Sequence, residues 1–172
     1  MNISFIIIQF IGVVAWLLLV YSYYRKDTNE ILSIHIIAAC LYAIHYYYLG
    51  AYSAVVICLF EALRDYGYYK TDIDRYIYIG SLPIYVLIGI FNFKTIVDTL
   101  PIISSLIDGY VLTKHKKIVV LGAILSYLLW VIYNINVKSY SGIITDGILV
   151  LSNLSILIFN KGLFKNKDIR KK

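Results

Sequence analysis

The sequence predicts an all-α membrane protein, in which seven transmembrane helices form two parallel three-helix repeats joined by a linker helix. Three observations lead to this fold class. The composition is 60% hydrophobic and only 15% charged, with a mean hydropathy of +0.76, whereas a soluble domain is near half apolar and a quarter charged. The apolar residues fall into seven long runs, and two stretches of the sequence repeat without a gap.

Each apolar run is close to the length that a helix needs to cross a membrane, which is roughly 20 residues. The predicted spans are Ile3–Tyr23, Ile31–Leu49, Ala51–Tyr69, Tyr76–Phe93, Ile96–Thr113, Ile118–Asn136 and Tyr140–Phe159. Only Gly50 separates the second span from the third, so these two helices must be antiparallel neighbours. Barrel strands would be about half as long and would alternate apolar with polar residues, so the runs predict helices.

The basic residues are distributed unequally between the two sides of the predicted bundle. Of the 16 Lys and Arg residues, only Lys94 and Lys138 lie on the side that holds the amino terminus. Because Lys and Arg stay on the cytoplasmic side of membrane proteins, we expect the amino terminus outside and the carboxyl terminus in the cytoplasm. The formal net charge of +6 therefore reflects topology, and we expect no nucleic-acid partner.

A gap-free internal repeat links the two halves of the chain. Leu41–His45 returns as Leu129–Tyr133, and Tyr52–Val56 returns as Tyr140–Ile144. The residue numbers differ by 88 in both cases (129 − 41 and 140 − 52). Both matches fall around the end of the second helix and the start of the third in each unit. One span lies between the units, so both enter the membrane from the same side and are parallel.

The repeat divides the chain into four parts. We expect the first three-helix repeat at residues 1–70, a linker helix at 71–94, the second repeat at 95–160 and a basic cytoplasmic tail at 161–172. The tail is expected either to rest on anionic lipid headgroups or to be a solvated flank of the last span. Repeated units of this kind occur among secondary carriers.

Five stretches of the chain resemble the YgjV-type bacterial inner-membrane proteins. They are Ile11–Arg25, the turn His45–Tyr52, Ala62–Arg64, Trp130–Asn134 and Gly142–Asn153. The resemblance covers most of the chain and implies a multi-pass protein of the bacterial inner membrane. It implies no particular activity, because the family has none established.

The order of three, one and three helices is also similar to the SWEET and PQ-loop architecture, which has an aromatic residue in the second helix of each unit and Asn in the last. The chain departs from that architecture at the end of the first helix, where Tyr23–Lys26 stands in place of the Pro-Gln pair. The fifth span has Pro101 near its start but again no Pro-Gln pair. This resemblance therefore implies a fold, and sugar transport is not carried over.

Ionisable residues inside a span are expensive and usually face a bundle interior or a cavity. Glu61 lies near the middle of the third span and is the leading candidate, as a carboxylate that accepts a proton or binds a cation. Arg64 lies one helical turn away and offers the alternative of a structural ion pair. Asp65 is also within one turn, so Arg64 can be shared between two acids. Both interpretations of Glu61 stay open.

Three further acids lie in predicted spans. Asp146 sits beside small residues in the seventh span, and either lines an outward-facing vestibule or bonds to a neighbouring Ser or Tyr. Asp98 and Asp108 flank Pro101 in the fifth span. A proline frees a backbone carbonyl, which makes this span a candidate gating element, although proline kinks are also common in helices without a transport role.

A second candidate group consists of Trp130, Tyr133, Asn134 and Asn153. An amide offers both a donor and an acceptor, and an indole offers a stacking face and one donor. Together these side chains suit a neutral polyhydroxylated or heteroaromatic ligand. The alternative is that Asn153 bonds between helices and that Trp130 contributes packing.

Two functions of different classes fit these residues. The first is a small-solute carrier with a central substrate pocket between the two repeats. The second is a non-transporting membrane protein, such as a receptor, an assembly factor or a partner subunit. We expect neither an enzyme nor a cofactor or metal, since the sequence has no metal-ligand spacing, phosphate loop or catalytic triad. The lipid bilayer is the expected partner, and a homo-oligomer is left open.

Overall fold

The computed structural model of the protein describes residues 3–22, 24–25, 27–71, 74–92, 94–111 and 116–159, and this part of the chain is all-helical. The helices are α1 (Ile3–Ser22), α2 (Thr28–Tyr48), α3 (Tyr52–Lys70), α4 (Asp74–Asn92), the 3₁₀ helix η1 (Ile96–Thr99), α5 (Leu100–Val111), α6 (Lys116–Asn136) and α7 (Tyr140–Phe159). The predicted basic tail at 161–172 lies outside the described residues.

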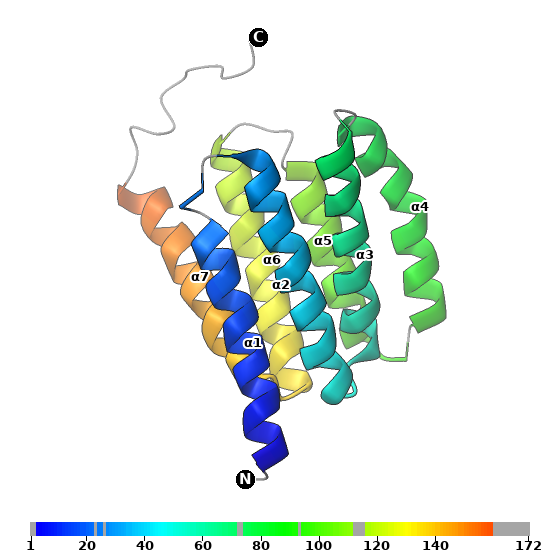
Figure 1. The fold of residues 1–172 in the computed structure, drawn as a ribbon, viewed down its shortest axis with the longest axis vertical. Coiled ribbons are helices and arrows are strands. Elements are labelled where there is room, and N and C mark those ends of the chain that lie inside the picture. The colour runs from blue at the N-terminus through cyan, green and yellow to red at the C-terminus, as the bar shows by residue number, and fades with distance from the viewer. Residues whose placement is uncertain are drawn as a thin grey trace.

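Six of these helices form a closed ring. Going around it, α1 packs on α2, α2 on α3, α3 on α5, α5 on α6, α6 on α7, and α7 on α1 again. The remaining helix, α4, packs on α3 and α5 at the edge of the bundle (Figure 1). The amino terminus lies at the same end as the α2–α3 and α6–α7 turns (Figure 1), which we call the hairpin end. The α1–α2 connection lies at the opposite end. We call this the basic end, because the sequence predicts that most of the Lys and Arg residues lie on this side.

The α2–α3 and α6–α7 hairpins match in the length of their first helix and of their turn. Helices α2 and α6 each have 21 residues, and in both hairpins the next helix begins after three connecting residues. Each turn contains one residue with positive φ, Gly50 at 72° and Lys138 at 57°. The Ala51 N–H donates to the Tyr46 carbonyl, and the Ser139 N–H donates to the Asn134 carbonyl, both at 3.0 Å. Every residue of one turn therefore has a counterpart 88 positions later, which is the offset of the sequence repeat.

Local capping determines how two of the predicted spans begin. Helix α2 begins three residues before the predicted Ile31, since the Asp27 carboxylate accepts the Glu30 N–H at 3.0 Å and caps the first turn. The predicted fifth span begins as η1, where Thr95 and Asp98 form a reciprocal capping box. Helix α5 follows at Leu100, and Pro101 lies in its first turn.

Four helices in the described residues are long and apolar enough to cross a membrane: α1, α2, α6 and α7. Helix α3 has 19 residues but carries Glu61, Arg64, Asp65 and Lys70. The apolar part of α4 is shorter, Tyr76–Phe91, and α5 has only 12 residues. Length and hydropathy thus confirm four of the predicted spans, α1, α2, α6 and α7, as helices long enough to cross a membrane. That α3, α4 and α5 also cross the membrane stays a prediction.

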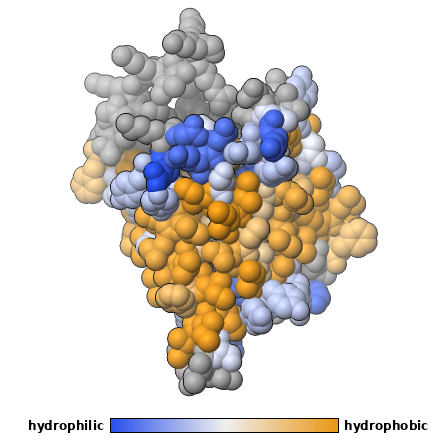
Figure 2. Space-filling view, viewed as in Figure 1, coloured by the Kyte–Doolittle hydropathy of each residue, from blue (hydrophilic) through white to orange (hydrophobic). Residues whose placement is uncertain are grey.

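The outer surface is apolar where a membrane would surround the bundle. Hydrophobic side chains cover the middle of the visible face, and hydrophilic ones gather toward its two ends (Figure 2). Large side chains such as Phe10, Leu151 and Phe91 are 65%, 68% and 82% exposed. An apolar surface of this extent requires lipid or protein against it, so the exposed faces are suited to hydrocarbon.

The turn geometry predicts opposite effects for two substitutions at equivalent positions. An L-residue in the left-handed region costs roughly 1–2 kcal/mol, so Gly50→Ala should lower the melting temperature by about 3 °C in detergent. Lys138→Gly should not lower it, because glycine adopts positive φ without strain.

Gly80→Ala is the matched control, since a Cβ at this helical position meets nothing within 4 Å. Equal melting temperatures for Gly50→Ala and Gly80→Ala would contradict the assigned turn.

Candidate functional site

The centre of the ring is occupied by buried polar and aromatic side chains. Asn134 on α6 is fully buried. Its Oδ1 accepts the Tyr46 hydroxyl of α2 at 2.9 Å, and its Nδ2 donates to Asp146 Oδ2 of α7 at 2.8 Å. The bond between Tyr46 and Asn134 joins residues that are 88 positions apart. These contacts connect three helices through one amide.

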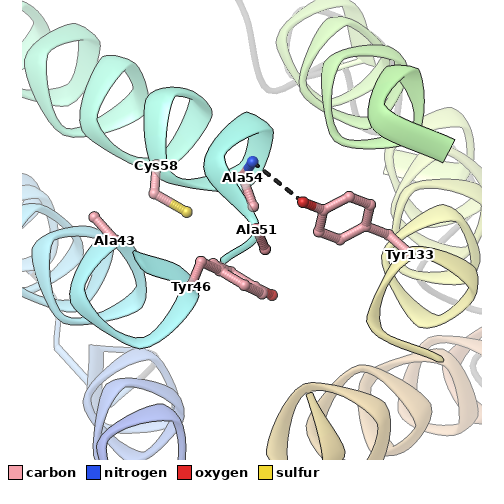
Figure 3. Close-up of a cluster of buried hydrophobic side chains, with 6 residues drawn as sticks. All are labelled: Ala43, Tyr46, Ala51, Ala54, Cys58 and Tyr133. Atoms are coloured by element: carbon pink, nitrogen blue, oxygen red, sulfur yellow. Dashed lines mark hydrogen bonds between the residues drawn. The ribbon is translucent and has the colours of Figure 1, made fainter. Parts of the chain in front are cut away.

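Aromatic rings surround this amide. The Tyr46 ring stacks with Tyr42, with centroids 6.2 Å apart, and with Trp130, at 5.7 Å. Tyr133 meets the Trp130 ring edge-on at 5.7 Å. Figure 3 shows Tyr46 and Tyr133 reaching into the space between their helices, with Ala43, Ala51, Ala54 and Cys58 around them. Since α2 and α6 are not direct neighbours in the ring, these large side chains fill the centre between them.

A network of polar contacts closes the hairpin end of the bundle. The Ser53 hydroxyl donates to Asp98 Oδ1 at 2.9 Å and receives the Tyr133 hydroxyl at 2.8 Å. The Ala54 N–H also donates to the Tyr133 oxygen at 3.3 Å (Figure 3).

The other hairpin is held in a similar way. The Ser141 N–H and hydroxyl donate to Gln9 Oε1 on α1, at 2.9 and 3.0 Å. His45 Nδ1–H donates to the Ile8 carbonyl at 2.8 Å, so its Nε2 accepts the Ser139 hydroxyl at 2.8 Å. His45 is fully buried and both of its ring nitrogens are bonded.

A second polar cluster lies toward the basic end. Glu61 on α3 accepts the Ser105 hydroxyl of α5. The Arg64 guanidinium lies 3.4 Å from Asp65 and donates to the Tyr85 hydroxyl of α4 at 3.1 Å. The structure thus places Asp65 at salt-bridge distance from Arg64, while the hydrogen bond that Glu61 accepts comes from a neutral hydroxyl of another helix and Arg64 acts on Glu61 only through its charge.

Asp108 also accepts a hydrogen bond from a neutral hydroxyl group. Ser126 on α6 donates to Asp108 Oδ2 at 2.7 Å, and the Ser104 and Ser126 hydroxyls are 2.6 Å apart. Both serines are fully buried, so this chain of hydroxyls connects α5 to α6 inside the bundle.

The two hydrophobic cores of the bundle meet at Trp130. Trp130 packs on both hydrophobic cores, one around Tyr46 and Tyr133 and the other around Ile57 and Tyr85.

The predicted site residues divide between these regions. Trp130, Tyr133, Asn134 and Asp146 come together around Tyr46. The other predicted residues of the bundle interior, Glu61, Arg64 and Asp108, lie in and beside the second cluster.

Two predicted residues occupy other positions. The Asn153 amide donates to the Leu149 carbonyl of its own helix at 2.8 Å, two turns along α7 from Asp146. Pro101 lies in the first turn of α5, where the transition from the 3₁₀ helix occurs. A proline near a helix start removes few hydrogen bonds, whereas Pro83 lies inside α4.

Three residues of the network were not anticipated from the sequence. Tyr85 is fully buried at mid-helix, and its position away from the span ends is the signal that distinguishes it from interfacial tyrosines. Gln9 is an amide within an otherwise apolar helix, which is itself a signal. Ser139 has no such signal, because a serine in a turn is ordinary.

The buried polar groups are almost all satisfied within the described part of the chain. There, the Trp16 indole N–H is the one buried side-chain group without a hydrogen-bond partner. Among the described residues, no group of three His, Cys, Asp or Glu side chains is placed to hold a metal ion. The functional groups of the interior are therefore carboxylates, hydroxyls and amides, and they lie among aromatic rings.

One described pocket lies at the basic end, away from the aromatic centre. It has a volume of about 390 Å³ and is lined by Tyr21, Arg25, Asp27, Asn29, Glu30, Ser33, Ile34 and Tyr69. Arg25 lies over the Tyr21 ring and 3.9 Å from Glu30, so the pocket already contains a partly exposed ion pair.

A ring of helices with an apolar exterior, four membrane-length helices and carboxylates in its interior defines an integral membrane protein. A family model described as bacterial inner membrane protein, Imp-YgjV, matches residues 6–160. The chain therefore belongs to the Imp-YgjV family, which confirms the resemblance seen in the sequence and places the protein in the bacterial inner membrane. Comparisons with curated proteins and with solved structures gave no match.

The position of Asn134 predicts that Gly142 cannot be enlarged. A Cβ at Gly142 would lie 2.5 Å from Asn134 Nδ2, and this amide is held by two hydrogen bonds. Overpacking of this kind costs about 1–3 kcal/mol, so Gly142→Ala should lower the melting temperature by about 5 °C. The same change made in an Asn134→Ala background should cost much less, because the obstructing amide is gone.

Gly147→Ala on the same helix is the control, since a Cβ there meets nothing within 4 Å. An equal loss for Gly142→Ala in both backgrounds would show that Asn134 is not the obstructing group.

Proposed function

We propose that the protein is a small-solute carrier of the bacterial inner membrane, with a substrate site between two parallel three-helix repeats. The observation that carries this proposal is the set of three interior carboxylates whose hydrogen-bond donors are neutral, with Arg64 also acting electrostatically on Glu61. Glu61 is bonded by Ser105, Asp108 by Ser126, and Asp146 by Asn134. Ionisable residues inside a membrane commonly mark substrate, ion or proton pathways, and a carboxylate whose hydrogen-bond donor is a hydroxyl or an amide can gain a proton while it keeps that hydrogen bond.

The proposed repeats are α1–α3 and η1–α7, with α4 as the linker helix. The order of contacts supports this arrangement, because exchanging α1, α2, α3 with α5, α6, α7 maps the ring onto itself. The matching turns at Gly50 and Lys138 support it as well. Parallel repeats around an axis along the membrane normal are known in carriers, and the SWEET-like architecture is proposed on this basis.

The proposal requires all seven helices to cross the membrane. Helix α5 spans about 18 Å at 1.5 Å per residue, and the four residues of η1 add about 8 Å. The total is near the roughly 30 Å of a hydrocarbon core. In α3, the charged side chains Arg64 and Asp65 are mostly buried, at 10% and 12% exposure, so they would not face lipid.

The proposed topology places the hairpin end outside and the basic end in the cytoplasm. We expect Lys138→Cys, at an exposed turn, to react with a membrane-impermeant thiol reagent added to intact cells. Thr71→Cys, exposed at the other end of α3, should react only in inverted vesicles. Both variants carry Cys40→Ala, because Cys40 is exposed. The reverse labelling pattern would overturn the orientation.

The proposed solute contacts are Trp130, Tyr133, Asn134, Asn153 and Asp146. Four of them already lie around Tyr46, where aromatic faces and amide groups converge. Glu61 is the proposed coupling residue, and Arg64, Asp108 and Pro101 have proposed structural or gating roles. No catalytic role is proposed for any residue, and the partners are the bilayer and an unidentified small solute.

The first test is a search for a stabilising ligand. The purified protein is heated with sugars, nucleosides, vitamins and amino acids, because a ligand of the folded state raises the melting temperature by mass action. A concentration-dependent rise that is lost in Asn134→Ala would establish a site at the aromatic centre. Asn136→Ala is the matched control, since Asn136 is exposed and bonds to its own helix.

The second test concerns the coupling residue. Uptake of the identified ligand into proteoliposomes should depend on pH in the parent, and Glu61→Gln should abolish this dependence while leaving folding intact. Glu30→Gln, at an exposed carboxylate, should leave the dependence unchanged. If Glu61→Gln retains the pH profile of the parent, Glu61 is not the coupling residue.

A non-transporting role is the second candidate, and one observation favours it. The described side chains at the centre bond directly to one another and are nearly fully buried, with Tyr46 at 3% and Tyr133 at 1% exposure. Such packing also suits a subunit whose polar residues only hold helices together. A flat response to every ligand, with Asn134→Ala unfolding at a lower temperature than the parent, would support this role and contradict the carrier.

A further inference from the structure

The hydrogen bonds at the hairpin end connect the two proposed repeats in a crossed manner. Ser53 and Ser141 both lie in the first turn of the second helix of a hairpin, in α3 and α7. Their numbers differ by 88 (141 − 53). Ser53 donates to Asp98, which precedes α5, and Ser141 donates to Gln9 on α1. Each serine is therefore bonded to the first helical segment of the other repeat.

A second pair of equivalent residues adds to the crossing. His45 on α2 bonds to Ser139 in the α6–α7 turn, and Tyr133 on α6 bonds to Ser53 at the start of α3. Residues 45 and 133 also differ by 88. The two side chains have different chemistry, yet each extends from the middle helix of one repeat to the hairpin of the other.

We propose that Ser53 and Ser141 are a pair of crossed latches that close the bundle at the hairpin end, and that both must release before the centre opens toward that side. This inference rests on the proposed function, since it assumes a central site that opens. Ser53 and Ser141 are 3% and 4% exposed, so the closed state excludes solvent from both hydroxyls.

When the hydroxyl of either latch serine is removed, the groups that it bonded keep other hydrogen bonds, so we expect the fold to survive. Without the Ser53 hydroxyl, Asp98 still accepts the Thr95 N–H at 2.9 Å, and Tyr133 still accepts the Ala54 N–H. Without the Ser141 hydroxyl, Gln9 Oε1 still accepts the Ser141 backbone N–H. Removing both hydroxyls therefore weakens the contact between repeats without leaving a buried charge unpaired.

Cys58 provides a natural reporter behind the latches. It lies on α3, five residues beyond Ser53 and so about 7.5 Å deeper, and it is 4% exposed in the cluster with Tyr46 and Tyr133. Its reaction with a small thiol reagent measures how often the hairpin end opens. The other cysteine, Cys40, is removed as Cys40→Ala.

The experiment compares alkylation of Cys58 in the full chain with and without the latches. Ser53→Ala/Ser141→Ala should raise the rate about tenfold for a membrane-impermeant reagent applied at the hairpin end, because interhelical hydrogen bonds in membranes each contribute a factor of a few. The rate from the basic end should stay at that of the parent. The hairpin end is identified independently by labelling of Lys138→Cys.

The matched control is Ser33→Ala/Ser155→Ala. These exposed hydroxyls bond to carbonyls of their own helices, so the labelling rate should equal that of the parent. If the latch variant folds and its Cys58 is alkylated at the parental rate, the proposal is overturned. An alkylation rate that rises equally from both ends would also overturn it, because that result indicates a general loosening of the bundle. If the double variant does not fold, Tyr133→Phe removes one crossing bond at nearly constant volume, and a parental rate in that variant likewise overturns the proposal.

The readout separates this inference from the proposed function, because labelling of Cys58 needs no solute. A latch-dependent rate in a protein that transports nothing would support the latches and contradict the carrier. If the latch variant still takes up solute and its Cys58 is labelled at the parental rate, the result would support the carrier and contradict the latches.

Discussion

The constraint on which this structure depends is that polar groups inside a membrane protein must find partners within the protein. Asn134 meets this requirement at the centre, where it accepts from Tyr46 and donates to Asp146. One amide therefore holds three helices from the two hairpins. Hydrocarbon offers no alternative partner to any of these groups, so the positions of α2, α6 and α7 are coupled, and the aromatic rings stacked around Tyr46 occupy the remaining space.

The contact between Tyr46 and Asn134 also shows how equivalent positions acquire different chemistry. Two residues 88 positions apart meet directly, and a hydrogen bond between them needs one donor and one acceptor. A phenol and an amide satisfy this need. The same divergence is found at His45 and Tyr133, which both extend to the opposite hairpin but bind it through an imidazole and a phenol. Backbone geometry is thus shared between the hairpins while the side-chain bonds are not.

The interior acids fall into two kinds. Asp65 has a cationic neighbour in Arg64, and this pair is explained by structure alone. Glu61, Asp108 and Asp146 have hydroxyl or amide donors, an arrangement that accommodates either protonation state. Trp130 packs against both hydrophobic cores, so it lies where the surroundings of Asp146 and those of the other two acids meet. The proposed carrier function and the closed hairpin end are consistent with that arrangement.

The sequence by itself determined the helices, the hairpin turns and the family, because hydropathy and turn chemistry are local properties. Hydropathy predicts the limits of α6 and α7 within two residues, and residue type alone indicates Trp130, Tyr133, Asn134 and Asp146 as site residues. Tertiary structure alone decided that Arg64 meets Tyr85 and that Ser105 bonds to Glu61. A membrane helix is apolar on nearly every side, so its sequence does not reveal which face meets which neighbour. Those pairings follow only from the packing of distant helices.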